Sequence, residues 1–227
     1  MERDVGYFQI PVEKTCIIPP GIKIYSGPVK DLRDKWGIGP EEKVIGVIGR
    51  LKPDRGYDVI LKAFKIIRSN IEHVKLVIMG RSSQIEKSIK EPLIKLGIEQ
   101  DVILAGYIIE DYFSAISTFD VFVMMRAGSD GTARALREVM SMAVPAVVSD
   151  SGMLPELVKD GVDGYVVLDE YELSEKVIMI LKNDELRHNL GAMAKQKAID
   201  EWDYKKQAKR LLDFYERLLR KKDKKER

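Results

Sequence analysis

The sequence predicts an α/β fold with a doubly wound parallel sheet. Short apolar runs, several of them ended by glycine, alternate with segments in which apolar residues recur at helical spacing. This alternation predicts parallel strands joined by crossover helices. Glycine-rich loops follow several of the apolar runs, so we expect them to meet at the carboxyl edge of the sheet, where open α/β sheets bind ligands.

Composition limits the function classes. The 227 residues are 45% apolar and 33% charged, with a formal net charge of +2, so no strong field for nucleic acid is expected. Cys16 is the single cysteine, which excludes an internal disulfide and fits a reducing, cytoplasmic compartment. No apolar stretch approaches the roughly 18 residues of a spanning helix, and residues 1–10 lack the apolar centre of a signal peptide. The small number of thermolabile amides favours a thermophilic source weakly; a highly charged mesophile stays open.

The first part of the chain is poorly periodic. We expect an edge strand at residues 12–18, ended by Pro19-Pro20-Gly21, and a short helix at residues 31–36, closed by Gly37. Residues 1–42 are interpreted as a lead-in segment of the domain that residues 43–227 form.

From residue 43 onward, strands and helices alternate. Strands are expected at residues 43–49, 74–80, 101–105, 120–125, 144–148 and 165–168. Helices are expected at residues 57–69, 82–96 with an interruption near Pro92, 110–118, from 132 onward, shortly after Gly152, and at 172–182, 184–202 and 204–220. The inward-facing residues are expected to be Val59, Ile60, Ala63, Phe64, Ile66 and Ile67 in the first helix, and Ala133, Leu136, Val139, Met140 and Ala143 in the helix from 132.

Residues 126–164 hold the densest set of ligand-binding signals. The loop 127–131, which contains two glycines, follows a buried strand and leads into a helix near Thr132. Free N–H groups and the positive dipole end at that helix start suit an anion, above all a phosphate. Asp130 on the loop and Glu138 about two turns along the helix are expected to face one crevice. Taken alone, Asp130 is better explained as an N-cap or turn residue and Glu138 as a solvent-facing residue, and only the wider motif favours a ligand-binding role.

This stretch resembles the signature of the retaining glycosyltransferases of family 4, which have the two-domain GT-B fold. Their motif is an acid, seven residues and Glu, then a small-residue helix, a Pro-containing strand and a Gly-Gly-x-x-Glu turn. The matching segments are Glu138-Val139-Met140-Ser141, Val144-Pro145-Ala146-Val147-Val148, Gly152-Met153-Leu154-Pro155-Glu156 and Asp160-Gly161-Val162-Asp163-Gly164. Two positions depart from the motif, because Asp130 replaces the first Glu and Met153 replaces the second glycine.

The resemblance implies a role for each of these residues. Glu138 would accept hydrogen bonds from the nucleotide ribose, and Asp130 would contact hydroxyls of the transferred sugar as part of the catalytic set. The residues expected to offer backbone groups to the phosphate at the helix start are Gly131, Thr132, Ala133 and Arg134.

A basic loop strengthens the resemblance. Gly49-Arg50 and Arg55-Gly56 are similar to the family's Gly-Arg, four residues, Lys-Gly loop, with Arg55 in place of Lys. The resemblance implies that Arg50 and Arg55 are catalytic, because fixed cations stabilise a leaving diphosphate that gains negative charge. Taken alone, two solvated loop arginines are the simpler interpretation.

Two further loops belong to the same predicted edge. Gly80-Arg81 and Gly106-Tyr107 match family loops that border the nucleotide base, so Arg81 and Tyr107 are assigned to the nucleotide-sugar site. Tyr107 is interpreted either as stacking on the base or as a partly buried core residue. No His, Cys and Asp cluster has ligand spacing, so neither a metal nor another cofactor is expected. The dinucleotide fingerprint Gly-x-Gly-x-x-Gly is missing, which argues against a dehydrogenase.

The predicted molecule is the single C-terminal, Rossmann-like half of a GT-B fold with C-terminal helices. Its function would be donor binding in a retaining, hexosyltransferase-type enzyme that moves a sugar from a nucleotide diphosphate to a hydroxyl acceptor. The partner would be an N-terminal acceptor domain in the same or a separate chain, without which weak or no activity is expected. A non-catalytic nucleotide-sugar-binding module is the alternative, and an epimerase ranks last. The basic tail at residues 220–227 leaves a peripheral membrane contact open, with few cations for firm binding.

Overall fold

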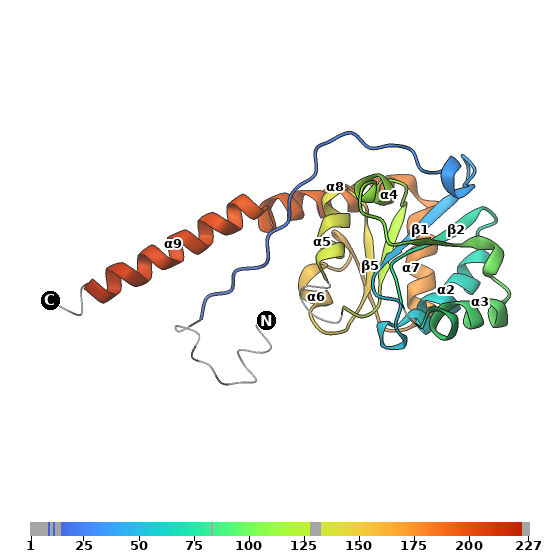
Figure 1. Ribbon diagram of the computed structural model, residues 1–227, viewed down its shortest axis with the longest axis horizontal. Coiled ribbons are helices and arrows are strands. Elements are labelled where there is room, and N and C mark those ends of the chain that lie inside the picture. Colours follow the sequence, from blue (N-terminus) through green and yellow to red (C-terminus); the bar gives the residue numbers. More distant parts are fainter. Residues whose placement is uncertain (1–8, 10, 12–14, 83, 128–132, 224–227) are drawn as a thin grey trace.

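The computed structural model describes residues 9, 11, 15–82, 84–127 and 133–223. Six parallel strands form one sheet in the order β3-β2-β1-β4-β5-β6 (Figure 1). They are β1 (Lys43–Ile48), β2 (Val74–Met79), β3 (Val102–Gly106), β4 (Val121–Met124), β5 (Ala146–Ser149) and β6 (Gly164–Val167). The predicted doubly wound α/β fold is confirmed, and each strand predicted from residue 43 onward is present with ends shifted by at most two residues.

Helices cover both faces of the sheet. They are α2 (Tyr57–Arg68), α3 (Glu91–Leu96), α4 (Tyr112–Ile116), α5 (Arg134–Ser141), α6 (Leu154–Leu157), α7 (Glu170–Lys182), α8 (Asp184–Glu201) and α9 (Tyr204–Asp223). One apolar core joins the sheet to α2, α3 and α7, and a second joins its other face to α4, α5, α6 and the later turns of α8. Every residue of β4 and β5 is buried, which explains their continuous apolar runs.

The last helix, α9, leaves the body of the domain and extends away from it (Figure 1). No helix in the described part of the chain combines the length and the apolar content needed to cross a membrane.

Three predicted elements differ in the structure. The expected edge strand is wrong for residues 15–18, which form none, while residues 12–14 lie outside the described residues. The short helix near residue 31 is a 3₁₀ turn, Asp34–Trp36. The helix expected at residues 82–96 is a π-helical segment, Glu86–Lys90, followed by α3. Pro92 does not break it, because Pro92 lies in the first turn of α3, where a missing N–H is tolerated.

The inward faces were predicted well, with local errors. Ala143 is exposed instead of buried, because α5 ends at Ser141 and Ala143 turns the chain with φ of +61°. In α2, Val59 and Ile66 are only half-buried, while Leu61 is fully buried.

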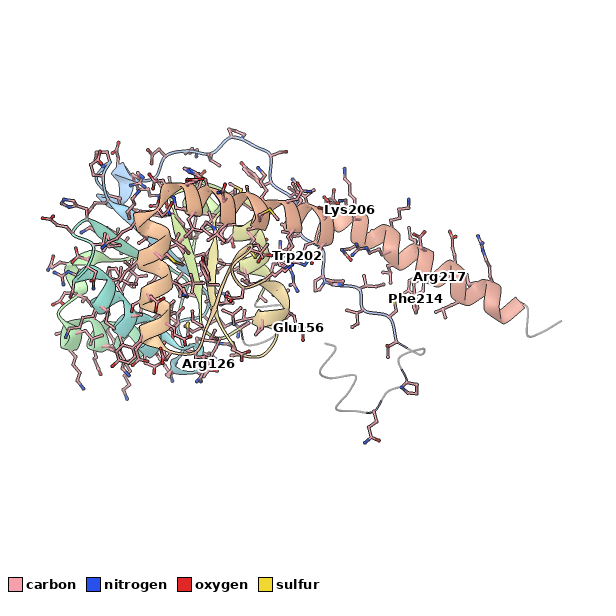
Figure 2. The ribbon with its side chains drawn as sticks, turned by 180° about the vertical axis from the view of Figure 1, so that it is seen from behind. Arg126, Glu156, Trp202, Lys206, Phe214 and Arg217 are labelled. Atoms are coloured by element: carbon pink, nitrogen blue, oxygen red, sulfur yellow. The ribbon has the colours of Figure 1, made fainter. Side chains whose placement is uncertain are left out.

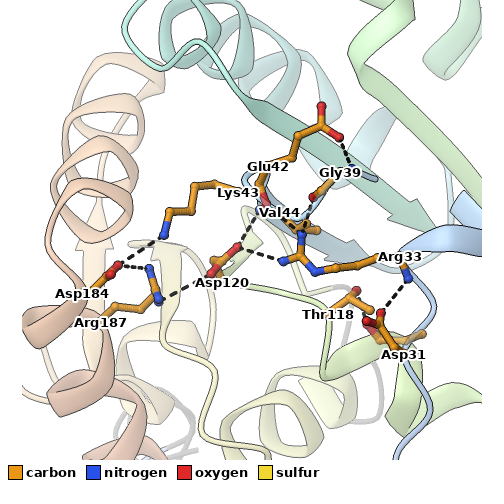
Figure 3. A network of polar contacts seen from close by, with 11 residues as sticks. Asp31, Arg33, Gly39, Glu42, Lys43, Val44, Thr118, Asp120, Asp184 and Arg187 are labelled. Atoms are coloured by element: carbon orange, nitrogen blue, oxygen red, sulfur yellow. Dashed lines mark hydrogen bonds and ion pairs between the residues drawn. The ribbon is translucent and has the colours of Figure 1, made fainter. Parts of the chain in front are cut away.

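A polar network connects β1 to β4 at the amino edge of the sheet (Figure 3). Asp120 Oδ2 accepts a hydrogen bond from Val44 N at 2.8 Å, and Asp120 N donates to Val44 O at 2.8 Å. Arg33 and Arg187 approach the same carboxylate at 3.8 and 3.5 Å. This network lies at the opposite edge from the glycine-rich loops, so its contribution is to the fold.

Candidate functional site

The carboxyl edge of the sheet contains a switch in strand order. Strands β2 and β3 lie on one side of β1, and β4, β5 and β6 lie on the other, so the order reverses between β1 and β4. In open α/β sheets, ligands bind in the crevice at this point. Gly49 N donates to Met79 O at 3.0 Å, and Gly80 N donates to Gly106 O at 2.8 Å. These bonds fix the loops after β1, β2 and β3 relative to one another.

The loop after β1 closes onto the end of β4. Leu51 is buried and its N–H donates to the carbonyl of Arg81 at 3.3 Å. At the end of the loop Gly56 has φ of +73°, and a Cβ there would lie 2.7 Å from Met125 Cβ. Glycine is needed for both reasons. The loop therefore brings Arg55 and the start of α2 against the residues that follow β4.

Three arginines line a small cavity at the switch point. Its volume is about 30 Å³, and Arg50, Arg55 and Arg126 surround it together with Tyr57. No carboxylate is present among its described lining residues. Burial raises the pKa of Tyr57, so its phenol stays neutral. Arg126, labelled in Figure 2, was missed by sequence reasoning, although a cation directly after a buried strand was a usable signal.

Arg55 is the most constrained of these arginines. Its side chain is 19% exposed, and its buried Nε has no hydrogen-bond partner among the described residues. Asp54 Oδ1 lies 3.8 Å from that Nε, which is an ion-pair distance but too long for a hydrogen bond. A buried donor without a partner is costly, and an acceptor in the adjoining cavity, either a water or an anionic ligand, would satisfy it.

A larger, open hollow adjoins the arginine cavity. It measures about 780 Å³ and is lined by Arg50, Lys52, Pro53, Asp54, Arg81, Ser82 and Gln84. Arg50 lines both spaces, so the cationic surface is continuous from the loop after β1 to the loop after β2.

Arg81 and Tyr107 form a pair on neighbouring loops. The guanidinium carbon of Arg81 lies 4.9 Å from the centre of the Tyr107 ring. Tyr107 is 64% exposed, so the alternative of a partly buried core tyrosine is wrong. The Arg81 cation therefore covers one face of a ring that is otherwise largely exposed.

Glu138 is not among the lining residues of either cavity, but it is only 7% exposed, so the alternative of a solvent-facing helix residue is wrong. Its Oε2 accepts a hydrogen bond from the Tyr112 hydroxyl at 2.9 Å, and its Oε1 accepts one from Arg134 Nε at 2.8 Å. The bond to Glu138 raises the pKa of Arg134, and burial raises the pKa of Tyr112. Both donors therefore keep their protons at neutral pH. Nothing in the local pattern around Tyr112 indicated this contact.

The loop that precedes α5 is only partly described. The predictions for Asp130, Gly131 and Thr132 lie outside the described residues. Ala133 is fully buried, and α5 begins at Arg134 without a side-chain cap. Among the residues that the structure does describe, no group of three or more His, Cys, Asp or Glu is arranged to hold a metal ion.

Solved structures share this fold. HepE from Anabaena, in complex with UDP and glucose, superposes with a TM-score of 0.79 at 21% identity, covering 91% of this chain and 58% of that one. A glycosyltransferase from Rickettsia africae gives a TM-score of 0.85 at 14% identity, covering 96% of this chain and 61% of that one. These likenesses show the fold, which is that of one Rossmann-like half of a GT-B glycosyltransferase.

Sequence relatives agree with the fold. A trehalose synthase of Pyrococcus horikoshii is 24% identical over 217 residues, 88% of this chain and 52% of that protein. A GDP-mannose-dependent mannosyltransferase of Mycolicibacterium smegmatis, acting on phosphatidylinositol monomannoside, is 27% identical over 211 residues, 87% of this chain and 55% of that protein. The chain thus spans about half the length of these curated relatives. The family model "Glycosyl transferases group 1" matches residues 28–197, and the chain belongs to that family.

Proposed function

We propose that this chain is the donor-binding half of a retaining glycosyltransferase of family 4. It would bind a nucleotide diphosphate sugar and, with an acceptor half, transfer the sugar to a hydroxyl group with retention of the anomeric configuration. The cationic cavity at the switch point carries this proposal. Arg50, Arg55 and Arg126 all line it, with no carboxylate among its described lining residues, and the buried Nε of Arg55 has no hydrogen-bond partner among the described residues.

The positive charge of these arginines suits a diphosphate, which is larger than the 30 Å³ cavity and would also occupy the adjoining hollow that Arg50 lines. During transfer, the bond between the anomeric carbon and the terminal phosphate oxygen breaks, and a bond from that carbon to the acceptor oxygen forms. The acceptor proton passes to the departing phosphate oxygen. The negative charge that grows on the leaving diphosphate is stabilised by Arg50 and Arg55, which in this proposal supply the positive charge themselves.

The other predicted residues extend the site from the diphosphate. Glu138 would accept hydrogen bonds from the ribose, and Tyr107 would stack on the base once Arg81 has moved aside. The relatives support a nucleotide donor in general: HepE was solved with UDP, and the mannosyltransferase is GDP-mannose-dependent by name. They differ in the base, so the base of this donor is left to experiment.

Titration calorimetry of the chain with UDP, GDP and ADP, and with the matching monophosphates, tests the proposal. Arg55→Ala is expected to weaken binding of the preferred diphosphate about tenfold, because one charge-assisted bond to phosphate is lost. The monophosphate should be affected much less. Lys65→Ala removes an exposed cation of α2 away from the cavity and is the matched control for net charge. Equal losses with Arg55→Ala and Lys65→Ala, or no nucleotide binding by the wild type, would contradict the assigned site.

Helix α9 supplies the surface for the acceptor half in this proposal. It carries an apolar face exposed to solvent, with Leu212 and Leu219 at 62% and 64% exposure. Phe214, on the part of the helix clear of the domain (Figure 2), is half-buried and lies on the other side of the helix. The segment at residues 15–22 meets the start of α9, where Ile22 N donates to Trp202 O at 2.7 Å. A half-fold connected through that segment would lie beside the apolar face. The half-length match to the relatives is consistent with a second half of similar size.

The double variant Leu212→Ser, Leu219→Ser tests this surface. We expect it to lower self-association of the isolated chain in sedimentation experiments, because a contiguous apolar patch promotes association. Nucleotide affinity should not change, since α9 lies outside the cavity. With the acceptor half present, the same variant should lower turnover. Binding of the wild type to anionic vesicles, lost in the variant, would instead assign the face to a membrane surface.

A further inference from the structure

The two donors that hold Glu138 differ in how firmly they are fixed. Tyr112 is mostly enclosed, and its ring packs edge-on against Phe113 at 5.3 Å between centroids. Phe113 is stacked in turn on Tyr25 at 4.3 Å. The Tyr112 hydroxyl is therefore held in place by an aromatic cluster. Arg134, on the other side of the carboxylate, has a side chain that is 68% exposed.

Access to the Glu138 carboxylate is correspondingly one-sided. Its side chain is 9% exposed, and the exposed group bonded to it is the Arg134 guanidinium, through Oε1. The exposed Arg134 guanidinium can return to water at little cost, but the buried carboxylate then needs another donor in its place. A ligand hydroxyl could thus replace Arg134 at Oε1 while Tyr112 keeps Oε2 fixed. A carboxylate with two oxygens can serve both partners at once.

We propose that Tyr112 is a positioning residue that orients Glu138 towards the nucleotide ribose, and that Arg134 is a displaceable partner occupying the place of the ribose until the nucleotide binds. The inference rests on the proposed function, since it takes a ribonucleotide as the ligand. It adds a residue from α4, distant in sequence from the loop and helix that carry the predicted site. Recognition of the ribose hydroxyls would then depend on the Tyr112 hydroxyl, which precedes Glu138 by 26 residues in the sequence.

The test compares each nucleotide with its 2′,3′-dideoxy form. Calorimetry on the full chain gives the dissociation constants of UDP, GDP and ADP and of their dideoxy counterparts. For each base, the dissociation constant of the dideoxy form divided by that of the ribonucleotide measures recognition of the ribose hydroxyls. The wild type is expected to prefer the ribonucleotide about tenfold or more, as for a hydrogen bond to a charged group. Tyr112→Phe should reduce this ratio at least about threefold while changing dideoxy binding less than about twofold, because a freed carboxylate loses its orientation.

Arg134→Ala separates the two roles. Loss of a cation near the phosphates weakens both nucleotide forms alike, but removal of the competing partner should raise the ratio about twofold. Tyr165→Phe, which deletes a hydroxyl from strand β6, is the matched control and should leave the ratio unchanged. Melting curves establish that each variant is folded. If Tyr112→Phe is not folded at the assay temperature, the Arg134→Ala ratio still decides whether Arg134 competes with the ribose.

The outcomes distinguish this inference from the proposed function. A wild type that prefers the ribonucleotide, with the same ratio in Tyr112→Phe, overturns the positioning role and leaves nucleotide binding intact. A lower ratio in Arg134→Ala overturns the displacement. A wild type that binds diphosphates without regard to the ribose hydroxyls removes the role of Glu138 and this inference, but not the cationic cavity. No binding of any nucleotide removes the proposed function as well.

Discussion

Asp120→Ala is expected to lower the free energy of unfolding by about 3 kcal/mol, as for removal of one partner from a buried ionic network. The side chain of Asp120 is 14% exposed and accepts from the N–H of Val44, a residue that is fully buried. Its loss would leave that N–H without an acceptor and would remove the carboxylate that Arg33 and Arg187 share. Urea unfolding followed by circular dichroism measures the change.

Two matched variants separate the effect of the Asp120 charge from that of its hydrogen bond and from that of a surface ion pair. Asp120→Asn keeps an oxygen for the Val44 N–H but removes the charge, so it should lose roughly half as much stability. Asp200→Ala removes a carboxylate that pairs with Lys206 at the surface, and it should cause no measurable change. Nucleotide affinity should stay constant in all three, because Asp120 lies at the amino edge of the sheet. Equal stability of Asp120→Ala and the wild type would show that the network contributes little.

The strands and helices could be predicted because they depend on short-range patterns. The apolar run of β4 and the glycine-containing loops that follow the strands indicate buried parallel strands, and neither signal depends on residues distant in the sequence. The ends of helices and their inward-facing residues could be predicted less well where a turn or a cap sets the end of the helix. Ala143 fits the apolar period of α5, but the chain leaves the helix before it and turns with a positive φ. Helix α7 begins at Glu170, two residues before its predicted start, because the side chain of Asp169 accepts hydrogen bonds from the N–H groups of Tyr171 and Glu172.

The polar contacts of the site could be predicted only in part. The resemblance in sequence selects Arg50, Arg55 and Glu138 because each belongs to a motif of fixed spacing, and their roles stay predictions. The structure adds partners that no spacing encodes: Tyr112 reaches Glu138 from α4, and Arg126 joins the cavity from the end of β4. Such pairs depend on which loops the sheet order brings together, and that order is a property of the whole fold.

Gly80→Ala is expected to damage both the fold and the site. A Cβ on Gly80 would lie 1.9 Å from the carbonyl oxygen of Gly49 and 3.3 Å from Leu51 Cδ2. The nearer obstacle is backbone, so no side-chain rotation relieves it, and the ends of β1 and β2 must separate. We expect a loss of about 3 kcal/mol in the free energy of unfolding, at the upper end for inserted atoms in a packed interior. Urea unfolding measures this loss.

The same displacement of the β1 and β2 ends should also weaken ligand binding. Gly49 leads directly into Arg50, so moving its carbonyl moves the loop that lines the arginine cavity. Diphosphate affinity should therefore fall about tenfold in calorimetry, the size expected when a charged contact to phosphate is lost. Gly97→Ala is the control: Gly80 and Gly97 both have a positive φ, of +153° and +67°, but nothing lies within 4 Å of a Cβ added to Gly97. It should lose only about 1 kcal/mol from backbone strain and keep its nucleotide affinity. Similar losses of stability and affinity in both variants would mean that backbone strain, and not the close approach of β1 to β2, is what makes Gly80 necessary.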